Sequence, residues 1–147
     1  MREFETKSVR MERRLLITVR APAADIDRIL DEVTKFTPLP MGSRYDRNAF
    51  ETAAGTERYR PLEGAAAGAE AEVRRRPGVV HVNFELPDDQ ELLKTIVEAV
   101  FQIHSYQEPV IRVQEILTAR SKGLDDRQNP NRWWNTSGDW MEVKQVV

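Results

Sequence analysis

Two arginines, Arg58 and Arg60, stand two residues apart in an extended stretch, so their side chains project from the same face of a strand. Paired guanidinium groups can hold a phosphate or carboxylate through parallel hydrogen bonds. Glu63 follows close behind and completes a charged group. We therefore expect a small-anion site here. An ion-pair ladder is the alternative, because strand arginines commonly pair across a sheet or a subunit contact.

His104 ends the apolar stripe of an expected helix, and Tyr106 and Glu108 follow it. Imidazole and carboxylate groups are ligands for copper or zinc, so His104 and Glu108 form a candidate metal site of weak affinity, with His81 as a further ligand. The alternative is a histidine that the helix dipole favours at a helix C-terminus and that packs on Tyr106. We also count Tyr106 among the candidate ligand-binding residues, and we expect no resident cofactor.

The composition excludes several classes of chemistry. The 147 residues include 0 cysteines, which excludes disulfides, thiolate catalysis and cysteine-based metal sites. No Walker loop, G-x-S-x-G, H-E-x-x-H or EF-hand pattern occurs. We therefore assign no catalytic residue.

The charge balance argues against a nucleic-acid or membrane partner, because the formal net charge is -2 and no apolar run approaches a membrane span. The N-terminus is charged and lacks the apolar core of a signal peptide, so we expect a cytoplasmic protein. Residues 74–76 are three arginines in an expected turn, which is typical of a solvated loop.

Hydrophobic periodicity predicts two strand–helix units with a hairpin between them. Alternating or β-branched residues indicate strands, and apolar residues at i, i+3, i+4 and i+7 indicate helices. The expected elements are strands at 15–19, 80–86 and 110–117, helices over 26–33 and 93–104, and a hairpin formed by 45–52 and 57–62. Asp88 with Glu91 resembles a capping box before the second helix.

This order predicts an α+β, ferredoxin-like fold: an antiparallel sheet with two helices on one face. We place the domain at residues 13–117, after an N-terminal arm over 1–12. Residues 118–147 form a C-terminal extension that carries Trp133, Trp134 and Trp140. Arg132 beside the first two tryptophans resembles a single-strand binder, but we interpret the extension as a tail that packs on protein.

The run Gly55-Thr56-Glu57-Arg58-Tyr59-Arg60-Pro61-Leu62-Glu63-Gly64 resembles the inserted domain of the YqfO group of Nif-three-like proteins. The segment His104-Ser105-Tyr106-Gln107-Glu108-Pro109 resembles the end of that domain, and it also resembles a run in CutA proteins. The resemblance covers roughly residues 14–117. Ser105 replaces the usual proline of the inserted domain, and Gln107 replaces its usual glutamate.

This resemblance implies a CutA-like (PII-like) ferredoxin fold that assembles as a trimer. The dinuclear metal site of the full-length relatives lies in flanking domains that this chain lacks, so the resemblance does not carry over their chemistry. We expect a non-catalytic homotrimeric binding or regulatory module, with a cleft between subunits for a small anion, a nucleotide-like ligand or a metal ion. Phe50 and Tyr59 are the expected interface residues.

Two alternatives remain open from the sequence. One is an enzyme whose active site is shared between subunits, built from Glu63, His104 and arginines of different chains. The other is a protein-interaction module that acts through the tryptophans of the C-terminal extension.

Overall fold

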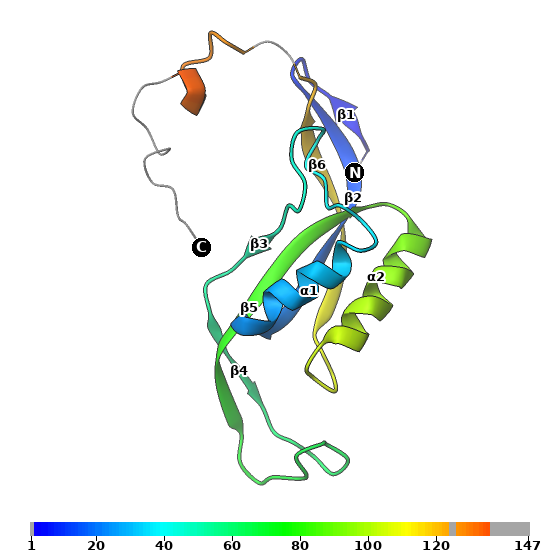
Figure 1. Ribbon diagram of the computed structural model, residues 1–147, viewed down its shortest axis with the longest axis vertical. Helices are drawn as coiled ribbons and strands as arrows, with labels where there is room; N and C mark the ends of the chain where they lie inside the picture. The colour runs from blue at the N-terminus through cyan, green and yellow to red at the C-terminus, as the bar shows by residue number, and fades with distance from the viewer. Residues whose placement is uncertain (1, 124–125, 136–147) are drawn as a thin grey trace.

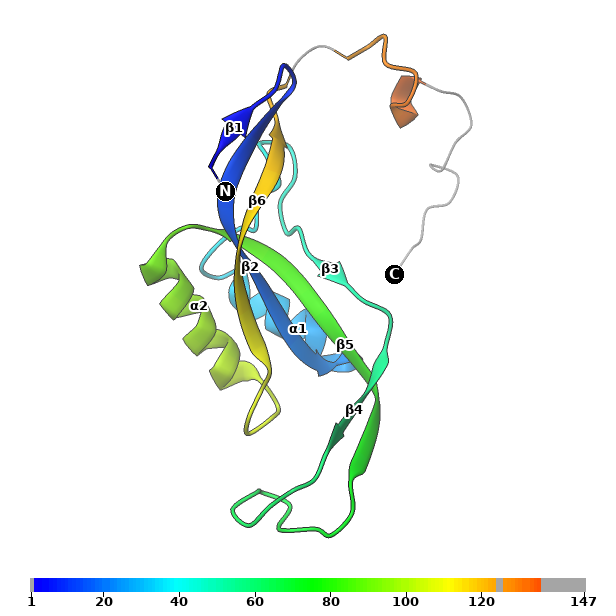
Figure 2. The same ribbon diagram turned by 180° about the vertical axis from the view of Figure 1, so that it is seen from behind.

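The computed structural model describes residues 2–123 and 126–135. Within them, six strands form one antiparallel sheet, and both α-helices lie on one face of it (Figure 1; Figure 2, from behind). In chain order the elements are β1 (Phe4–Glu5), β2 (Val9–Pro22), the 3-10 helix η1 (Ala23–Asp25), α1 (Ile26–Val33), β3 (Phe50–Glu51), β4 (Gly55–Tyr59), β5 (Arg74–Pro87), α2 (Gln90–Ile103), β6 (Ile111–Ser121) and the 3-10 helix η2 (Trp133–Asn135).

Strand β2 is the centre of the sheet. It pairs with β5 along residues 14–22 and with β6 along residues 9–19, and β1 pairs with its N-terminal end. Strands β3 and β4 both pair with the outer edge of β5. The resulting order, β6-β2-β5 followed by β3 and β4, is that of a ferredoxin-like sheet, which confirms the predicted fold class.

The core lies between the sheet and the two helices. Side chains alternate along a strand, so every second residue of β2 and β5 faces the helices. The predicted apolar stripe of α1 supplies Ile26, Ile29 and Val33, and α2 supplies Ile96 and Val100. The strands supply Leu15, Ile17, Val19, Ala21, Val80, Val82, Phe84 and Leu86, and Leu39 joins them from the segment between α1 and β3.

The start of α2 differs by one residue from the expected capping box. Asp89, rather than Asp88, is the N-cap, and its side chain accepts hydrogen bonds from the backbone N–H groups of Glu91 and Leu92. Asp89 has extended backbone angles, as an N-cap residue requires, so its carboxylate can turn back to the first helical turn.

The predicted hairpin between residues 45–52 and 57–62 is wrong. Strands β3 and β4 do not pair with each other but follow one another along the same edge of β5. Thr52 maintains the pairing between them: its N–H donates to the His81 carbonyl over 2.9 Å, and its Oγ1 accepts from the His81 N–H over 3.0 Å. A side-chain hydroxyl thus replaces a strand carbonyl, so the chain continues where the sequence suggested a turn. The hairpin is formed instead by β4 and β5.

The sheet face opposite the helices, which we call the open face, carries polar and charged contacts beside apolar residues such as Leu16. Thr18 Oγ1 donates to Asn83 Oδ1 over 2.6 Å. Glu85 lies between Arg14 and Arg120, with Oε1 at 3.3 Å from Arg14 Nε and 2.9 Å from Arg120 Nη2. These contacts cross the three long strands, so the open face is held together by polar groups.

The strands extend past the proposed domain limits, since β2 begins at Val9 and β6 ends at Ser121. The division at residues 12 and 117 stays a prediction. In the C-terminal extension, the rings of Trp133 and Trp134 meet edge to face at 5.8 Å, and Trp140 lies outside the described residues. No helix in the described part of the chain is long and apolar enough to cross a membrane.

Replacing Phe84 with alanine tests this core. The ring is 1% exposed, so the substitution should lower the free energy of unfolding by about 3–5 kcal/mol. Chemical denaturation measures the loss. Phe4→Ala is the matched control, because Phe4 is 50% exposed and its loss should change stability by less than about 0.5 kcal/mol. Equal losses in the two variants would contradict the assigned core.

Candidate functional site

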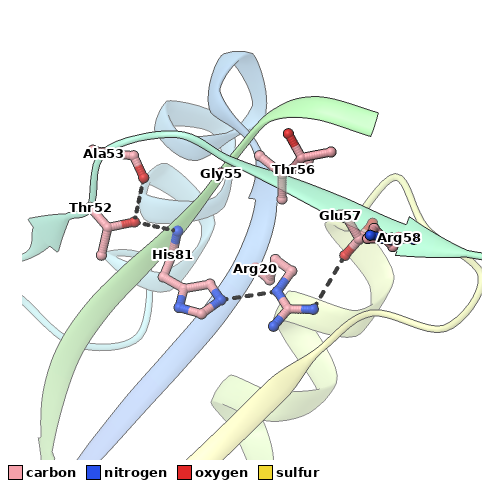
Figure 3. A pocket seen from close by; sticks show the side chains of 9 residues that line it. Arg20, Thr52, Ala53, Gly55, Thr56, Glu57, Arg58 and His81 are labelled. Carbon is pink, nitrogen blue, oxygen red and sulfur yellow. Dashed lines mark hydrogen bonds and ion pairs between the residues drawn. The ribbon is translucent and has the colours of Figure 1, made fainter. Parts of the chain in front are cut away.

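A cavity of about 360 Å³ opens on the sheet between β2, β5 and the segment that carries β4 (Figure 3). Its volume lies at the lower end of the range for ligand pockets, about 300–1,000 Å³. Polar groups and small residues form its walls: Arg20, Thr52, Ala53, Gly55, Thr56, Glu57, Arg58, Val79 and His81. We call this cavity the β4 pocket.

At the floor of the pocket, Arg20 and His81 share a hydrogen bond. Arg20 Nε–H donates to His81 Nε2 over 2.9 Å. An arginine side chain has no acceptor, so Nε2 of His81 must present its lone pair. The imidazole is therefore neutral, with its proton on Nδ1, and His81 has one N–H left to donate.

Strand register brings these two residues together. Arg20 of β2 lies directly opposite His81 of β5, and both lie on the open face. Thr52 then fixes the backbone of His81 through its paired hydrogen bonds on the other side. Because directly opposite residues share a sheet face at close range, the contact follows from the pairing of the strands.

The side of the pocket formed by β4 carries opposite charges. Glu57 Oε2 lies 3.6 Å from Arg20 Nη1, and its side chain is only 12% exposed. Arg58 also lines the pocket, and its side chain makes no hydrogen bond or ion pair with any residue in 2–123 or 126–135. The guanidinium of Arg58 is thus a free donor beside a neutral pair.

The environment of His81 disfavours its charged form. Burial lowers the pKa of His81 below its usual value, and the positive charges of Arg20 and Arg112 lower this pKa further. Arg112 comes from β6, beside Thr18 in the register. Arg20 and Arg112 thus act on the neutral imidazole, and Arg58 lines the same pocket. The pocket is therefore rich in hydrogen-bond donors and positive charge.

His104 has a structural position, away from the lining of the β4 pocket. Its Nδ1 accepts from the Tyr106 N–H over 3.0 Å, so Nε2 carries the proton and donates to the Arg20 carbonyl over 2.7 Å. The rings of His104 and Tyr106 lie 4.8 Å apart. A metal ion at His104 would have to displace one of these backbone partners. For this histidine the sequence left two roles open, a metal ligand or packing on Tyr106, and the structure shows the packing.

The residues around His104 connect separate parts of the fold. Ser105 Oγ donates to Asp25 over 2.7 Å, and the guanidinium of Arg76 lies 5.1 Å above the Tyr106 ring. Gln107 accepts from the Ala66 N–H over 3.0 Å and donates to the Gly64 carbonyl over 3.4 Å. We call residues 104–107 the connector. It ties the α2–β6 loop to η1, to β5 and to the loop between β4 and β5.

The structure separates the candidate residues into three groups. Arg58 lines the β4 pocket, whereas Arg60, Glu63 and Glu108 are exposed and lie outside its lining. His104 and Tyr106 belong to the connector. Phe50 is 68% exposed and Tyr59 is 37% exposed, on the edge strands β3 and β4. In the described residues no group of three or more His, Asp or Glu side chains is placed to hold a metal ion.

Sequence reasoning missed Arg20, Thr52 and Glu57 as pocket residues, and it gave His81 only as a metal ligand. A signal for His81 was present, because it lies on the polar side of a strand that alternates clearly. A comparable signal for Arg20 was weak: the strand was expected to end at residue 19, one residue before it.

Comparisons with known proteins support the fold. No family model matches the chain, and no curated protein sequence matches it. A Bacillus cereus protein related to NIF3 has 18% identity and a TM-score of 0.59 over 75% of this chain and 27% of its own. CutA1 of the psychrotrophic bacterium Shewanella sp. SIB1 has 17% identity and a TM-score of 0.50, over 71% of this chain and 82% of its own.

The divalent ion tolerance protein CutA1 from Ehrlichia chaffeensis has 15% identity and a TM-score of 0.50, over 80% of this chain and 89% of its own. The present chain spans about a quarter of the length of the NIF3-related protein but most of the length of both CutA1 proteins. The chain therefore has a ferredoxin-like fold that is similar to that of the two CutA1 proteins and of part of the NIF3-related protein.

Proposed function

We propose that this protein is a non-catalytic, homotrimeric binding or regulatory module that holds a small anion in the β4 pocket. The observation that carries the proposal is Arg58, which lines the pocket and whose guanidinium has no partner in the described residues. Working in the cytoplasm without a resident cofactor, such a module would report the level of its ligand through its assembled form.

The donors of the pocket support an anionic ligand. Arg58 offers its guanidinium, and His81 offers Nδ1–H, since Nε2 is engaged by Arg20. Glu57 is the charged acceptor, but its carboxylate already faces Arg20 at 3.6 Å. A ligand that accepts hydrogen bonds and carries negative charge therefore satisfies the free groups, and charge-assisted bonds of this kind are strong.

The edge of the sheet supports self-association. Phe50 and Tyr59 are exposed aromatic side chains on β3 and β4, beside the β4 pocket. Large aromatics contribute much of the buried area at interfaces. A neighbouring subunit packed against this edge would cover them and form the outer wall of the pocket. The trimer is the assembly that the YqfO resemblance implies.

Replacing Arg58 with alanine should weaken anion binding. Hydrogen bonds to charged groups contribute about 1.5–3 kcal/mol, so the affinity for sulfate should fall by about tenfold or more. Calorimetric titration with sulfate measures the change. Arg60→Ala is the matched control, since Arg60 is a nearby exposed arginine that does not line the pocket. If both variants bind sulfate as the wild type does, the pocket is not an anion site.

Light scattering should give a mass three times that of the 17.0 kDa chain. Phe50→Ala combined with Tyr59→Ala should shift the protein toward monomer at micromolar concentration, because the interface loses two aromatic anchors. Arg58→Ala is the comparison variant, and it should leave the mass unchanged. A wild-type protein that stays monomeric would refute the trimer, and dissociation caused by Arg58→Ala alone would place the interface in the pocket itself.

A further inference from the structure

The hydrogen bond between Arg20 and His81 occupies groups that a ligand would otherwise use. Arg20 Nε–H and the lone pair of His81 Nε2 satisfy each other over 2.9 Å. Protonation of His81 would end this bond, because an imidazolium has two N–H donors and no acceptor. Arg20 Nε–H and His81 Nε2–H would then both be free to donate. One internal hydrogen bond is exchanged for two donors.

The charged groups around His81 decide which ligand can drive this exchange. Arg20 faces it from β2, Arg112 from β6, and Glu57 and Arg58 line the same pocket from β4. On β5 itself the next residue on the open face is Asn83, which is uncharged. Arg76 of β5 also lies opposite Glu57. Arginines therefore outnumber the carboxylate of Glu57, and the surroundings of His81 carry excess positive charge before it takes up a proton.

We propose that the ligand of the β4 pocket is a doubly charged oxyanion of the phosphate or sulfate class, and that its binding is coupled to the uptake of one proton by His81. The inference builds on the proposed anion-binding function. A dianion compensates more of the excess positive charge than a monoanion does, and it offsets the repulsion between the new imidazolium and its arginine neighbours. A monoanion compensates less of this charge, so it raises the pKa of His81 by less.

In the ligand-free pocket, His81 is able to take up a proton when a ligand binds. Burial together with Arg20 and Arg112 lowers the pKa of His81, so the imidazole is neutral near pH 7 without a ligand. An adjacent dianion acts in the opposite direction and raises this pKa. The protonated pocket binds the dianion more tightly, so affinity is highest at low pH. The affinity decreases by up to about tenfold per pH unit as the pH rises from the pKa of the free state to that of the bound state, and it levels off above the latter.

Calorimetric titrations of the full chain with sulfate at neutral pH, in two buffers of different ionisation enthalpy, measure the proton uptake. Sulfate is the probe because its own charge does not change near neutral pH. The expected result is an uptake approaching one proton per sulfate bound. Nitrate, a monoanion, should bind more weakly and with little uptake. Histidine NMR resonances followed over pH should show that sulfate raises the pKa of His81.

His81→Gln is the matched variant. Glutamine keeps a side-chain oxygen that can accept from Arg20, but it cannot take up a proton. This variant should bind sulfate with little pH dependence and no proton uptake, while Arg58→Ala weakens binding at every pH. Thermal unfolding of His81→Gln without ligand shows whether the fold is intact, and the resonances of the sulfate-free wild type report the neutral histidine directly.

Two ligand sources share this chemistry, namely a free oxyanion and the phosphate group of a phosphomonoester. The cavity of about 360 Å³ has room beyond a bare oxyanion. Comparison of inorganic phosphate with glycerol 2-phosphate distinguishes them, since tighter binding of the ester indicates a phosphomonoester and tighter binding of phosphate indicates the free ion.

Two outcomes separate the coupled protonation from the anion site. If sulfate binds without proton uptake, and His81→Gln binds it with the same pH dependence as wild type, the coupling is refuted while the anion site stands. If neither sulfate nor nitrate binds, and Arg58→Ala makes no difference, the proposed function itself is refuted.

Discussion

The fold depends on the central strand β2, which is hydrogen-bonded on both edges. Between residues 14 and 19 it pairs with β5 on one side and β6 on the other, so its register is fixed twice. The alternation of side chains then sends Leu15, Ile17 and Val19 to the helices and Arg14, Thr18 and Arg20 to the open face. A slip by one residue would exchange these sets and bury arginines in the core. The register of β2 therefore fixes both the core and the candidate site.

The connector is the second determinant of the site. The His104 imidazole donates to the carbonyl of Arg20, whose guanidinium reaches into the β4 pocket. Gln107 binds one N–H and one carbonyl of the loop between β4 and β5, which a carboxylate could not do because it only accepts. The glutamine that departs from the family pattern thus has a local role. The two segments that carry the YqfO resemblance meet in space at this point.

Local patterns predicted the elements well where packing agrees with periodicity. The apolar stripe of α1 and the alternation of polar and apolar residues in β5 are visible in the sequence, and they predicted the ferredoxin-like arrangement. The β3–β4 edge was mispredicted because the small residues at 53–56, with Gly55 among them, suggested a tight turn, whereas the Thr52 hydroxyl continues the pairing with β5. The pairing of Arg20 with His81 joins residues 61 positions apart, and only strand register brings them together. Arg58 was predicted from its spacing to Arg60 in an extended stretch, but only Arg58 lines the pocket, and its role as an anion ligand stays a prediction.

The polar contacts of the open face have a consequence for assembly. Thr18 with Asn83, Arg20 with His81, and Glu85 with its two arginines already satisfy much of this surface within one chain. Water can therefore cover the face at little cost, unlike an apolar face that must be buried. Subunits that met at the neighbouring β3–β4 edge would gain little from burying this face as well, so they would exchange by mass action, with salt and protein concentration setting the assembled fraction. The same chain would then serve as a reversible partner to itself instead of a permanent one.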